Sequence, residues 1–526
     1  MTDNPPPLPD SRHVPAERVS KARTDSHAVL FLATFFALYA MISVGTALAI
    51  ARIGYLQSLL FFVTLQVINL GVAYGLAELI LGLLLPAYDL PQLQALCASP
   101  SVAVLCTTYN DIIPECMSSL TSQTYDHYTV FILDDSSDAQ CRSLVDALAE
   151  ANGFRVQRRA ERSGFKAGAL NEWLANSAQD FDYIVVVDAD SVLGETFIES
   201  MLGYAEHPDN RDVALFQSKI DYWNTDRVLP RVASYMLPAT FHVMDRLINS
   251  CGYLPSWGHN NMYRVSALLA SGGFDERFTS EDLATGLNMV RAGFRCRMVQ
   301  VVTSEAFPTT FSSYAGRSSR WARQTLQLVL HRRDSGGVPI STQMHILMAG
   351  YGYGIQVLFV LGMIAVAWAG HSSLADLRFV ITRLGDATMI GYLFLIAAHV
   401  SYLFLRNVPL AVKYRTGVWR YLVNLLMYLT LGCCSILPIA KGVVSALVSR
   451  KRRFPVTDKR QAPGNWRSEL RKQLPLMVLI AVVLAGLARN PVALLFNWHW
   501  ILPFVASPVV VSVMTRMEGR GVSRDP

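Results

Sequence analysis

The stretch Tyr183-Ile-Val-Val-Val-Asp-Ala-Asp190 decides the fold class of this chain. Five apolar residues, of which four are β-branched, run into two aspartates separated by one alanine. A continuous apolar run of this length is typical of a strand that is buried on both faces of a parallel sheet. Ligands of open α/β sheets bind at the carboxyl ends of the strands. We therefore expect Asp188 and Asp190 to lie at a ligand site.

Asp188 and Asp190 are candidate ligands of Mg²⁺ or Mn²⁺. Two carboxylates this close together at the edge of a sheet repel each other unless a cation lies between them. Mg²⁺ is usually held by one or two carboxylates together with the phosphate oxygens of a substrate. The alternative is a strand that ends in a turn with two solvated aspartates, and an isolated Asp-x-Asp pattern does not separate the two interpretations.

The composition indicates an integral membrane protein with a soluble part. Of the 526 residues, 52% are hydrophobic and only 16% are charged, whereas soluble proteins carry about 25% charged residues. The net charge of +6 is modest and the basic residues gather beside apolar segments, which follows the positive-inside rule and argues against nucleic-acid binding. The eight cysteines are scattered without a Cys-x-x-Cys pair, so we expect neither a disulfide framework nor a zinc site.

The first part of the chain is predicted to hold a tail, two membrane spans and a globular domain. Residues 1–26 are polar, basic and proline-rich, as is typical of a disordered tail. Residues 27–90 contain two apolar segments, Ala28–Ala51 and Leu56–Leu85, and each exceeds the roughly 20 residues needed to cross a bilayer. Residues 96–335 alternate β-rich runs with helical patterns, as in one cytosolic α/β domain. The runs are Val102–Cys106, Thr129–Leu133, Tyr183–Val187, Val213–Gln217 and Arg297–Val302.

Residues 343–526 are predicted to hold four further spans, which makes six in all. They are Gln343–Ala369, Met389–Leu405, Leu474–Ala488 and Val492–Thr515. The apolar stretch Tyr421–Val448 has basic residues on both flanks. A single crossing would leave one basic cluster on the wrong side, so we expect residues 421–448 to lie in the cytoplasmic interface with a kink at Leu437-Pro438. A true span that violates the charge rule is the alternative.

Two more strand exits carry polar residues at the same edge of the predicted sheet. One strand runs into Thr107-Thr108-Tyr109-Asn110-Asp111, and the next into Asp134-Asp135-Ser136-Ser137-Asp138. Such residues are common in turns, so either exit alone is weak evidence. Together with Asp188 and Asp190 they favour a nucleotide site, because carboxylates accept hydrogen bonds from a base N–H or a ribose hydroxyl.

The segment from Arg162 to Asn171 contains two glycines and Lys166. Glycine lets the backbone approach a ligand closely, and Lys166 can pair with a phosphate. The alternative is a glycine-containing helix start with a solvated lysine.

Ser280-Glu281-Asp282 opens a helical pattern. Ser280 suits an N-cap and the two acids suit a first helical turn, which requires no catalysis. The functional interpretation makes Asp282 a general base that takes a proton from an attacking hydroxyl. The sequence leaves both interpretations open.

A helix predicted over residues 312–333 carries Arg317, Arg320, Trp321 and Gln324 on one face, because they are spaced i, i+3, i+4 and i+7. Two guanidinium groups beside an indole suit a diphosphate and a sugar ring. The alternative is an amphipathic interfacial helix with arginines at the lipid headgroups. Both can hold for different faces of the helix.

Taken together, these stretches resemble the cellulose-synthase-like branch of the family 2 glycosyltransferases. The resemblance covers about residues 100–515, and its motifs follow the order of the family. They are Asp134-Asp135, Lys166–Gly168, Asp188-x-Asp190, Ser280–Asp282, Arg317–Trp321 and the Phe-x-Val-Thr-x-Lys sequence of Phe454–Lys459. In the family this last motif belongs to a gating loop, here within residues 450–462, of synthases that couple polymerisation to export.

The resemblance implies a GT-A domain, which is a Rossmann-like mixed α/β sheet, inserted into an α-helical transmembrane bundle. It implies a UDP-sugar donor with Mg²⁺ or Mn²⁺ held by Asp188 and Asp190. It further implies Asp282 as the base, with Arg320 and Trp321 steadying the diphosphate and the acceptor. The residues implied to hold the nucleotide are Thr107, Tyr109, Asp134, Asp135, Lys166, Asp188, Arg317, Phe454, Val456, Thr457 and Lys459.

Three departures from the family pattern bear on the product. Ser280 replaces threonine, which leaves Asp282 in place, and Arg317 replaces glutamine, which leaves the acceptor subsite undetermined. The segment Ser256–Asn261 is similar to the Trp-Gly-His-Asn sequence of bacterial osmoregulated glucan synthases rather than to the pattern of cellulose synthases. A β-glucan other than cellulose is the product that this resemblance implies.

The leading hypothesis is a processive inverting glycosyltransferase of the inner, or plasma, membrane that polymerises glucose from UDP-glucose and exports the chain between its helices. This hypothesis places the catalytic domain in the cytoplasm. The expected partners are the donor, the growing glycan and membrane lipid; a periplasmic or accessory subunit is compatible with the hypothesis, and nucleic acid is not among the partners. The alternative is a non-processive enzyme that adds one sugar to a lipid. A transporter or receptor that senses a nucleotide is the third hypothesis, and it requires neither Asp282 nor the Arg317–Trp321 face.

Overall fold

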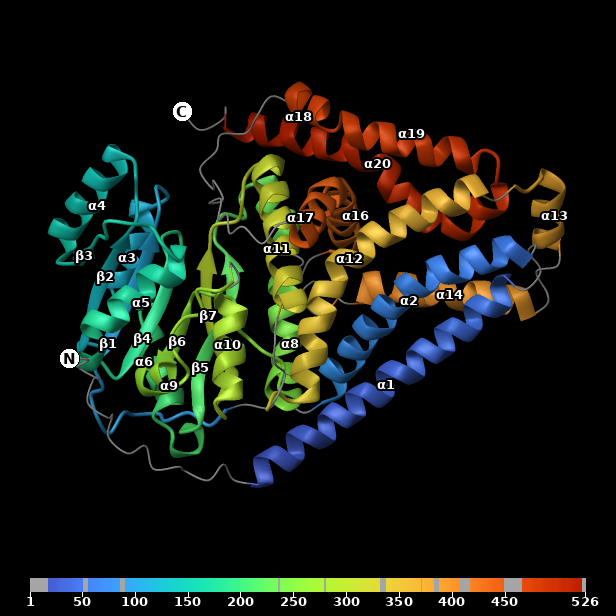
Figure 1. Cartoon of the computed structure of the whole chain (residues 1–526). Coiled ribbons are helices and arrows are strands. Elements are labelled where there is room, and N and C mark those ends of the chain that lie inside the picture. Colours follow the sequence, from blue (N-terminus) through green and yellow to red (C-terminus); the bar gives the residue numbers. More distant parts are fainter. Residues whose placement is uncertain are drawn as a thin grey trace, which may run out of the picture.

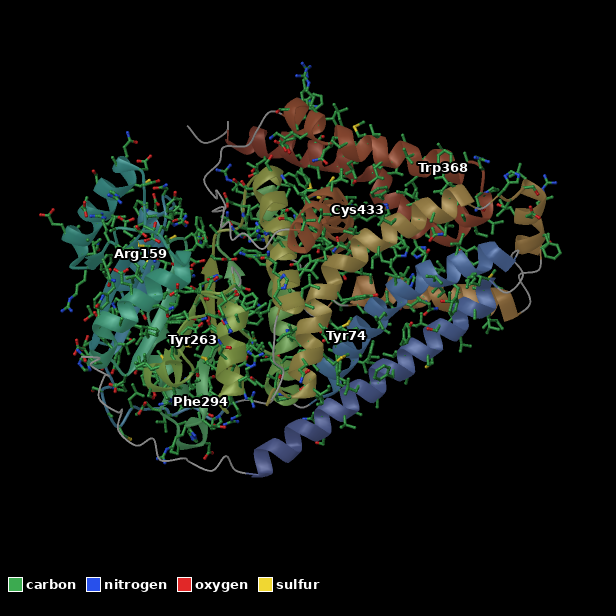
Figure 2. All side chains as sticks on the ribbon, viewed as in Figure 1. Tyr74, Arg159, Tyr263, Phe294, Trp368 and Cys433 are labelled. Atoms are coloured by element: carbon green, nitrogen blue, oxygen red, sulfur yellow. The ribbon has the colours of Figure 1, made fainter. Side chains whose placement is uncertain are left out.

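The computed structural model describes residues 18–50, 55–85, 90–234, 237–278, 281–331, 337–369, 371–382, 387–405, 408, 417–448 and 466–522. They form an α/β domain and a set of long helices that lie side by side (Figure 1). Figure 2 shows Arg159 and Tyr263 in the α/β domain, and Tyr74 and Cys433 among the long helices. The gating-loop motif and Ser280 lie outside the described residues.

A seven-stranded mixed sheet with strand order β3-β2-β1-β4-β6-β5-β7 forms the centre of the α/β domain. Strand β4 pairs in parallel with β1 on one side and antiparallel with β6 on the other. Only β6 runs against the others, so the carboxyl ends of β1, β2, β4, β5 and β7 share one edge with the amino end of β6. The strands are β1 (Val102–Thr108), β2 (Tyr128–Asp134), β3 (Arg155–Gln157), β4 (Tyr183–Asp188), β5 (Val213–Tyr222), β6 (Asn261–Arg264) and β7 (Arg295–Glu305).

The five predicted strands correspond to β1, β2, β4, β5 and β7, and the mixed GT-A-like sheet is confirmed. Strands β3 and β6 escaped the sequence analysis because they have only three and four residues. Strand β6 is held by ladders to β4 and β5 on both sides. These pairings are distant in sequence, so no local pattern reveals them.

Helices cover both faces of the sheet, which explains the continuous apolar run of β4. In β1, Val104 and Cys106 pack on the face covered by α3, α4 and α6, whereas Ala103 and Leu105 pack on the face covered by α5, α9 and α10. The helices and turns of the domain are α3 (Pro114–Thr121), α4 (Ala139–Asn152), α5 (Phe165–Ser177), η1 (Ala178–Asp180), α6 (Phe197–Ala205), η2 (Pro208–Asn210), α9 (Val265–Ala270) and α10 (Glu281–Arg291).

Among the described residues, four helices are individually long and apolar enough to cross a membrane, and the number reaches six if each of two bent helix pairs is one span. The four are Ser26–Ile50, Phe62–Leu84, Ile340–Trp368 and Pro491–Glu518. The long-helix part comprises α1 (Arg18–Ile50), α2 (Tyr55–Leu84), α12 (Ile340–Ala369), α13 (Leu374–Thr382), α14 (Ala387–Leu405), α16 (Val418–Cys434), α17 (Ile436–Val448), α18 (Trp466–Lys472), α19 (Leu474–Leu487) and α20 (Pro491–Val522).

Three details differ from the expected arrangement of these helices. Helix α1 begins at Arg18, so the last part of the predicted disordered tail is helical, because the apolar helix continues into a run of helix-forming residues. The apolar stretch of α14, Met389–Ser401, is shorter than the span predicted there. The predicted interfacial segment divides into α16 and α17, which meet at 42° around Ser435, two residues before the expected kink.

Helix α11 (Phe311–His331) stands between the two parts of the molecule, with α8 (Leu237–Cys251) nearby (Figure 1). Helix α7 (Val228–Ser234) precedes α8 in the chain. Helix α17 packs closely on it: a Cβ added at Gly442 would lie 2.2 Å from the backbone oxygen of Ser319. At the start of α11, the Ser312 hydroxyl contacts the buried Glu469 carboxylate of α18 at 3.3 Å, and Lys472 donates to both. Helix α11 therefore contacts both α17 and α18, the helices that precede and follow residues 449–465 in the sequence.

We expect Gly442→Ala to destabilise the protein, because the added methyl group must push α17 away from α11. Overpacking of this kind costs about 1–3 kcal/mol, and a lower temperature of thermal unfolding of the detergent-purified protein would report it. Gly316→Ala is the matched control, because an added Cβ at this α11 position meets no atom within 4 Å. Equal unfolding temperatures for the two variants would contradict the close helix contact.

Candidate active site

A cavity of about 920 Å³ extends from the carboxyl edge of the sheet into the long helices. On the domain side it is lined by Thr107, Tyr109, Asp135, Lys166, Asp188, Asp190 and Asp282. Helix α11 contributes Arg317, Arg320, Trp321 and Gln324, and further residues come from α2, α12, α16 and α20. The cavity therefore brings together residues that lie far apart in the sequence.

Among the site residues predicted within the described chain, Asp134 is not one of those that line the cavity. Its side chain is buried, accepts from the Ser136 N–H, and pairs with the Arg158 Nε at 2.7 Å. Asp134 thus joins β2 to the segment after β3. Phe454, Val456, Thr457 and Lys459 lie outside the described residues.

The loops after β1 and β2 are tied together at the cavity. Asn110 has a positive φ of 60°, a conformation that asparagine tolerates better than most residues. Its side-chain oxygen accepts from the backbone N–H groups of Ser137 and Asp138. This hydrogen bonding fixes the loop that presents Tyr109.

Asp135 and Tyr109 are both paired with arginines. The Asp135 carboxylate accepts a bidentate pair from Arg159 at 2.7 and 2.6 Å. The Arg162 guanidinium lies 3.5 Å from the centre of the Tyr109 ring. These contacts hold a carboxylate and an aromatic plane beside each other, which suits a nucleobase and a ribose.

Lys166 connects three parts of the site. Its ammonium donates to Asp188 at 2.5 Å and to the Gly258 oxygen at 2.9 Å. Burial lowers the pKa of Lys166, but Asp188 and Glu281 raise it more, so the net pKa lies above its usual value. Lys166 is therefore a partly buried cation at the strand edge.

The two glycines beside Lys166 serve packing within the protein rather than the expected close approach to a ligand. A Cβ at Gly164 would lie 2.4 Å from the Glu276 carboxylate, and one at Gly168 would lie 2.1 Å from the Ser163 oxygen. Gly164 also has a φ of 65°, which begins α5 in a left-handed turn.

Asp188 and Asp190 meet the requirements of a divalent cation only together with a substrate. Asp190 is 5% exposed, and its carboxylate accepts from the Ala306 N–H at 3.0 Å. Within the part of the chain that the structure describes, no group of three or more His, Cys, Asp or Glu side chains is arranged to hold a metal. Two carboxylates completed by phosphate oxygens are a usual set for Mg²⁺, so the donors present fit a metal–diphosphate complex.

Glu281 and Asp282 begin α10 and face the same cavity. The Asp282 carboxylate accepts from the Leu283 N–H at 2.7 Å. Gly258, with a φ of 83°, passes within contact distance of Asp282, where an added Cβ would be 3.1 Å away. Burial, and then the neighbouring Asp282, raise the pKa of Glu281 to about 7.

His259 is a site residue to which the sequence analysis gave no role. Its Nδ1 lies 3.8 Å from Asp188, and its Nε2 lies 2.9 Å from Glu305 at the end of β7. Burial lowers the pKa of His259, but the carboxylates of Asp188 and Glu305 outweigh it and raise the pKa. Recognition of β6 would have revealed His259, because an antiparallel strand that starts at Asn261 brings the preceding segment to the acidic edge.

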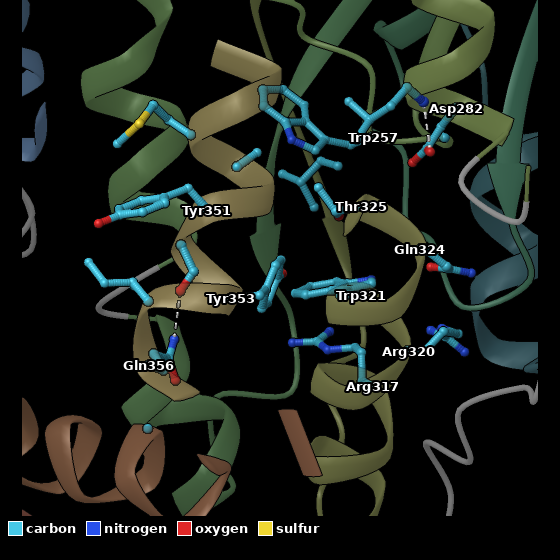
Figure 3. A pocket seen from close by; sticks show the side chains of 18 of the residues that line it. Trp257, Asp282, Arg317, Arg320, Trp321, Gln324, Thr325, Tyr351, Tyr353 and Gln356 are labelled. Atoms are coloured by element: carbon cyan, nitrogen blue, oxygen red, sulfur yellow. Dashed lines mark hydrogen bonds between the residues drawn. The ribbon is translucent and has the colours of Figure 1, made fainter. Parts of the chain in front are cut away.

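Helix α11 presents its polar face to the cavity in the order that the sequence predicted (Figure 3). Burial, and then the neighbouring Arg317, lower the pKa of Arg320 to about 10, whereas Asp188, Glu281 and Asp282 oppose the shift. Arg320 therefore stays protonated at neutral pH. It supplies a cation on the side of the helix that faces the acids.

Comparison with known proteins identifies the class of this molecule. A family model described as Glycosyl transferase family group 2 matches residues 183–515, which is more than half of the chain. The chain therefore belongs to this family. Its mixed sheet is GT-A-like, in keeping with this family.

Curated relatives match over a shorter region. Glucomannan 4-beta-mannosyltransferase 1 of Oryza sativa subsp. japonica is 28% identical over 206 residues, which is 38% of this chain and 39% of the rice protein. Glucomannan 4-beta-mannosyltransferase 9 of Arabidopsis thaliana is 27% identical over 206 residues, which is 38% of each chain. The chain thus spans about two fifths of the length of these relatives.

Among solved structures, this chain is similar to mannosyltransferase PcManGT from Pyrobaculum calidifontis in complex with GDP-Man and Mn²⁺. The sequence identity is 20% and the TM-score is 0.47, and the match covers 68% of this chain and 99% of that one.

The paired acids of α10 predict the pH dependence of transfer. Because the pKa of Glu281 is raised to about 7, the Glu281–Asp282 pair holds a proton below that pH. Protonation of Glu281 as the pH drops through about 7 removes the negative charge beside Asp282 and makes Asp282 a weaker base, so the turnover rate should fall. In Glu281→Gln the neighbouring group no longer titrates, so the acidic limb of the pH–rate profile near pH 7 should be lost. The exposed Glu115 provides the control variant Glu115→Gln, and an unmoved limb in Glu281→Gln would contradict the coupling.

Proposed function

We propose that this protein is a membrane-embedded, inverting and processive glycosyltransferase that builds a β-linked hexose polymer. The observation that carries the proposal is the single cavity from the acids of β4 and α10, along the Arg317–Trp321 face of α11, to the long helices. An enzyme that passes its product on to a membrane channel needs such a continuous route. Family membership favours this proposal over a receptor that only senses nucleotide.

In the proposed reaction Asp282 removes a proton from the acceptor hydroxyl, which attacks the anomeric carbon from the face opposite the nucleotide. Lys166 and Arg320 offset the negative charge that grows on the leaving diphosphate. Asp188 and Asp190 would hold Mg²⁺ or Mn²⁺, which when bound supplies further positive charge at the diphosphate. Trp321 offers an indole face against which the acceptor sugar can stack.

The nucleotide half of the proposed site lies at the β1 and β2 exits. Thr107, Tyr109 and Asp135 would hold the base and ribose, with Asp188 beside the diphosphate. The loop residues Phe454, Val456, Thr457 and Lys459 remain expectations from the family resemblance. We assign the catalytic domain to the cytoplasmic side of an inner or plasma membrane, because the basic residues gather beside the apolar segments.

The donor sugar is proposed within the hexoses, with UDP-glucose and GDP-mannose as the two to be compared. The family resemblance of the motifs favours UDP-glucose and a β-glucan. The names of the curated relatives denote a 4-beta-mannosyl transfer, which favours mannose. Incubating the purified protein with UDP-[¹⁴C]glucose or GDP-[¹⁴C]mannose and Mg²⁺ or Mn²⁺ separates the two, and absence of transfer from both would contradict a hexosyltransferase.

A non-processive enzyme that adds one sugar to a lipid is the second candidate. One observation favours it: Ile68 and Val72 of α2, with Ile355 and Phe359 of α12, give part of the cavity an aliphatic wall that suits a hydrocarbon chain. Sizing the labelled product distinguishes the candidates. A polymer supports the processive enzyme, whereas a single-sugar glycolipid would support the second.

Asp282→Asn should abolish transfer while nucleotide binding persists. The amide keeps the shape of the carboxylate but cannot accept the proton, and loss of a general base costs about 10²- to 10⁴-fold in rate. Transfer of labelled sugar and calorimetric titration with the nucleotide measure the two properties on the same preparation. Turnover close to that of the unaltered protein would exclude Asp282 as the base.

A further inference from the structure

Arg317 is a buried cation at the junction between the catalytic domain and the long helices. Its side chain is 4% exposed, although it belongs to the residues that line the cavity. The guanidinium carbon lies 4.1 Å from the centre of the Phe307 ring and 4.5 Å from that of Trp321. Aromatic rings hold the guanidinium in place without neutralising its charge.

The protein provides little counter-charge for Arg317. Its nearest carboxylate oxygen, on Glu305, is 4.0 Å from Nη1, and the other oxygen of Glu305 lies 2.9 Å from His259. Within the described part of the chain, Nε and Nη2 of Arg317 are buried without a hydrogen-bond partner. A buried charge is costly unless it is paired and hydrogen-bonded, so these two N–H groups point to a ligand.

Arg317 and Arg320 serve different regions of the cavity. Arg320 is close enough to Asp188, Glu281 and Asp282 for these acids to oppose the lowering of its pKa by burial. In Figure 3 the Arg317 side chain extends beneath Trp321 toward Tyr353 of α12, whereas Arg320 and Gln324 lie on the other side of Trp321. Arg317 therefore faces the space beyond the catalytic acids, where the acceptor and product pass in the proposed function.

We propose that Arg317 selects an acceptor that carries an anionic group, either a carboxylate or a phosphate. This inference rests on the proposed function, and it assigns Arg317 to the acceptor rather than to the nucleotide. The planar guanidinium offers parallel N–H groups that match the two oxygens of a carboxylate or phosphate, while Trp321 stacks on the neighbouring sugar ring. The anionic group is either a uronate within a glycan or the phosphate of a lipid-linked acceptor.

Binding measurements with matched charged and neutral probes test this inference on the full-length protein. In phosphatidylcholine nanodiscs with UDP present, cellobiouronic acid is compared with cellobiose, and farnesyl phosphate with farnesol. We expect the charged member of one pair to bind about 10- to 100-fold more tightly, as for hydrogen bonds to charged groups. Preference for the uronate identifies a glycan source, and preference for the phosphate identifies a lipid source.

Three variants attribute the preference to Arg317. Arg317→Gln should reduce it to less than about threefold, and Arg317→Lys should keep part of it because the charge remains. Arg323→Gln removes an equal charge from the same helix at a residue outside the cavity lining, and it should leave the preference unchanged. A preference that survives in Arg317→Gln, or equal binding of charged and neutral probes by the unaltered protein, would overturn the inference.

An assay of labelled-sugar transfer on the same nanodiscs tests the role of Arg317 and the proposed function separately. Transfer without any preference for charged probes would refute the role of Arg317 and leave the glycosyltransferase proposal standing. A preference for charged probes that depends on Arg317, without transfer from any hexose donor, would refute the proposed function and leave an anion site at α11.

Discussion

The structure depends on the accommodation of crowded negative charge at one edge of the sheet. Asp188, Asp190, Glu281, Asp282 and Glu305 line the same cavity, and Asp190 and Glu305 are buried. Repulsion among these carboxylates would destabilise this edge if the protein did not supply cations. The contact of Lys166 with Asp188 and the position of His259 between Asp188 and Glu305 supply them. A divalent cation held by Asp188 and Asp190 would offset part of the negative charge that remains.

The sequence was sufficient for features that depend on local pattern and strand direction. The apolar run of β4 predicted a buried strand, and Asp188 and Asp190 lie where the carboxyl end of that strand required. The helical spacing of Arg317, Arg320 and Trp321 likewise placed three cavity residues on one face of α11. Both signals lie within a short stretch of sequence, so they can be recognised without tertiary information.

Features that depend on pairing between distant segments could not be predicted. Strand β6 is too short to have a pattern of its own, so the position of His259 was hidden. Asp134 and Asp135 are adjacent and chemically equal in the sequence, yet one pairs with Arg158 away from the cavity lining and the other lines the cavity. The roles of Gly164 and Gly168 were also undetermined, because only the folded chain shows that Glu276 and Ser163 fill the space beside them.

The close approach of α17 to α11 at Gly442 has a mechanical consequence. Residues 449–465 depart from α17 and return at α18, and both helices are fixed to α11, the first through Gly442 and the second through Glu469. The helix that carries Arg317, Arg320 and Trp321 thus anchors both α17 and α18, so a displacement of α11 would move these two helices together with the side chains that line the cavity.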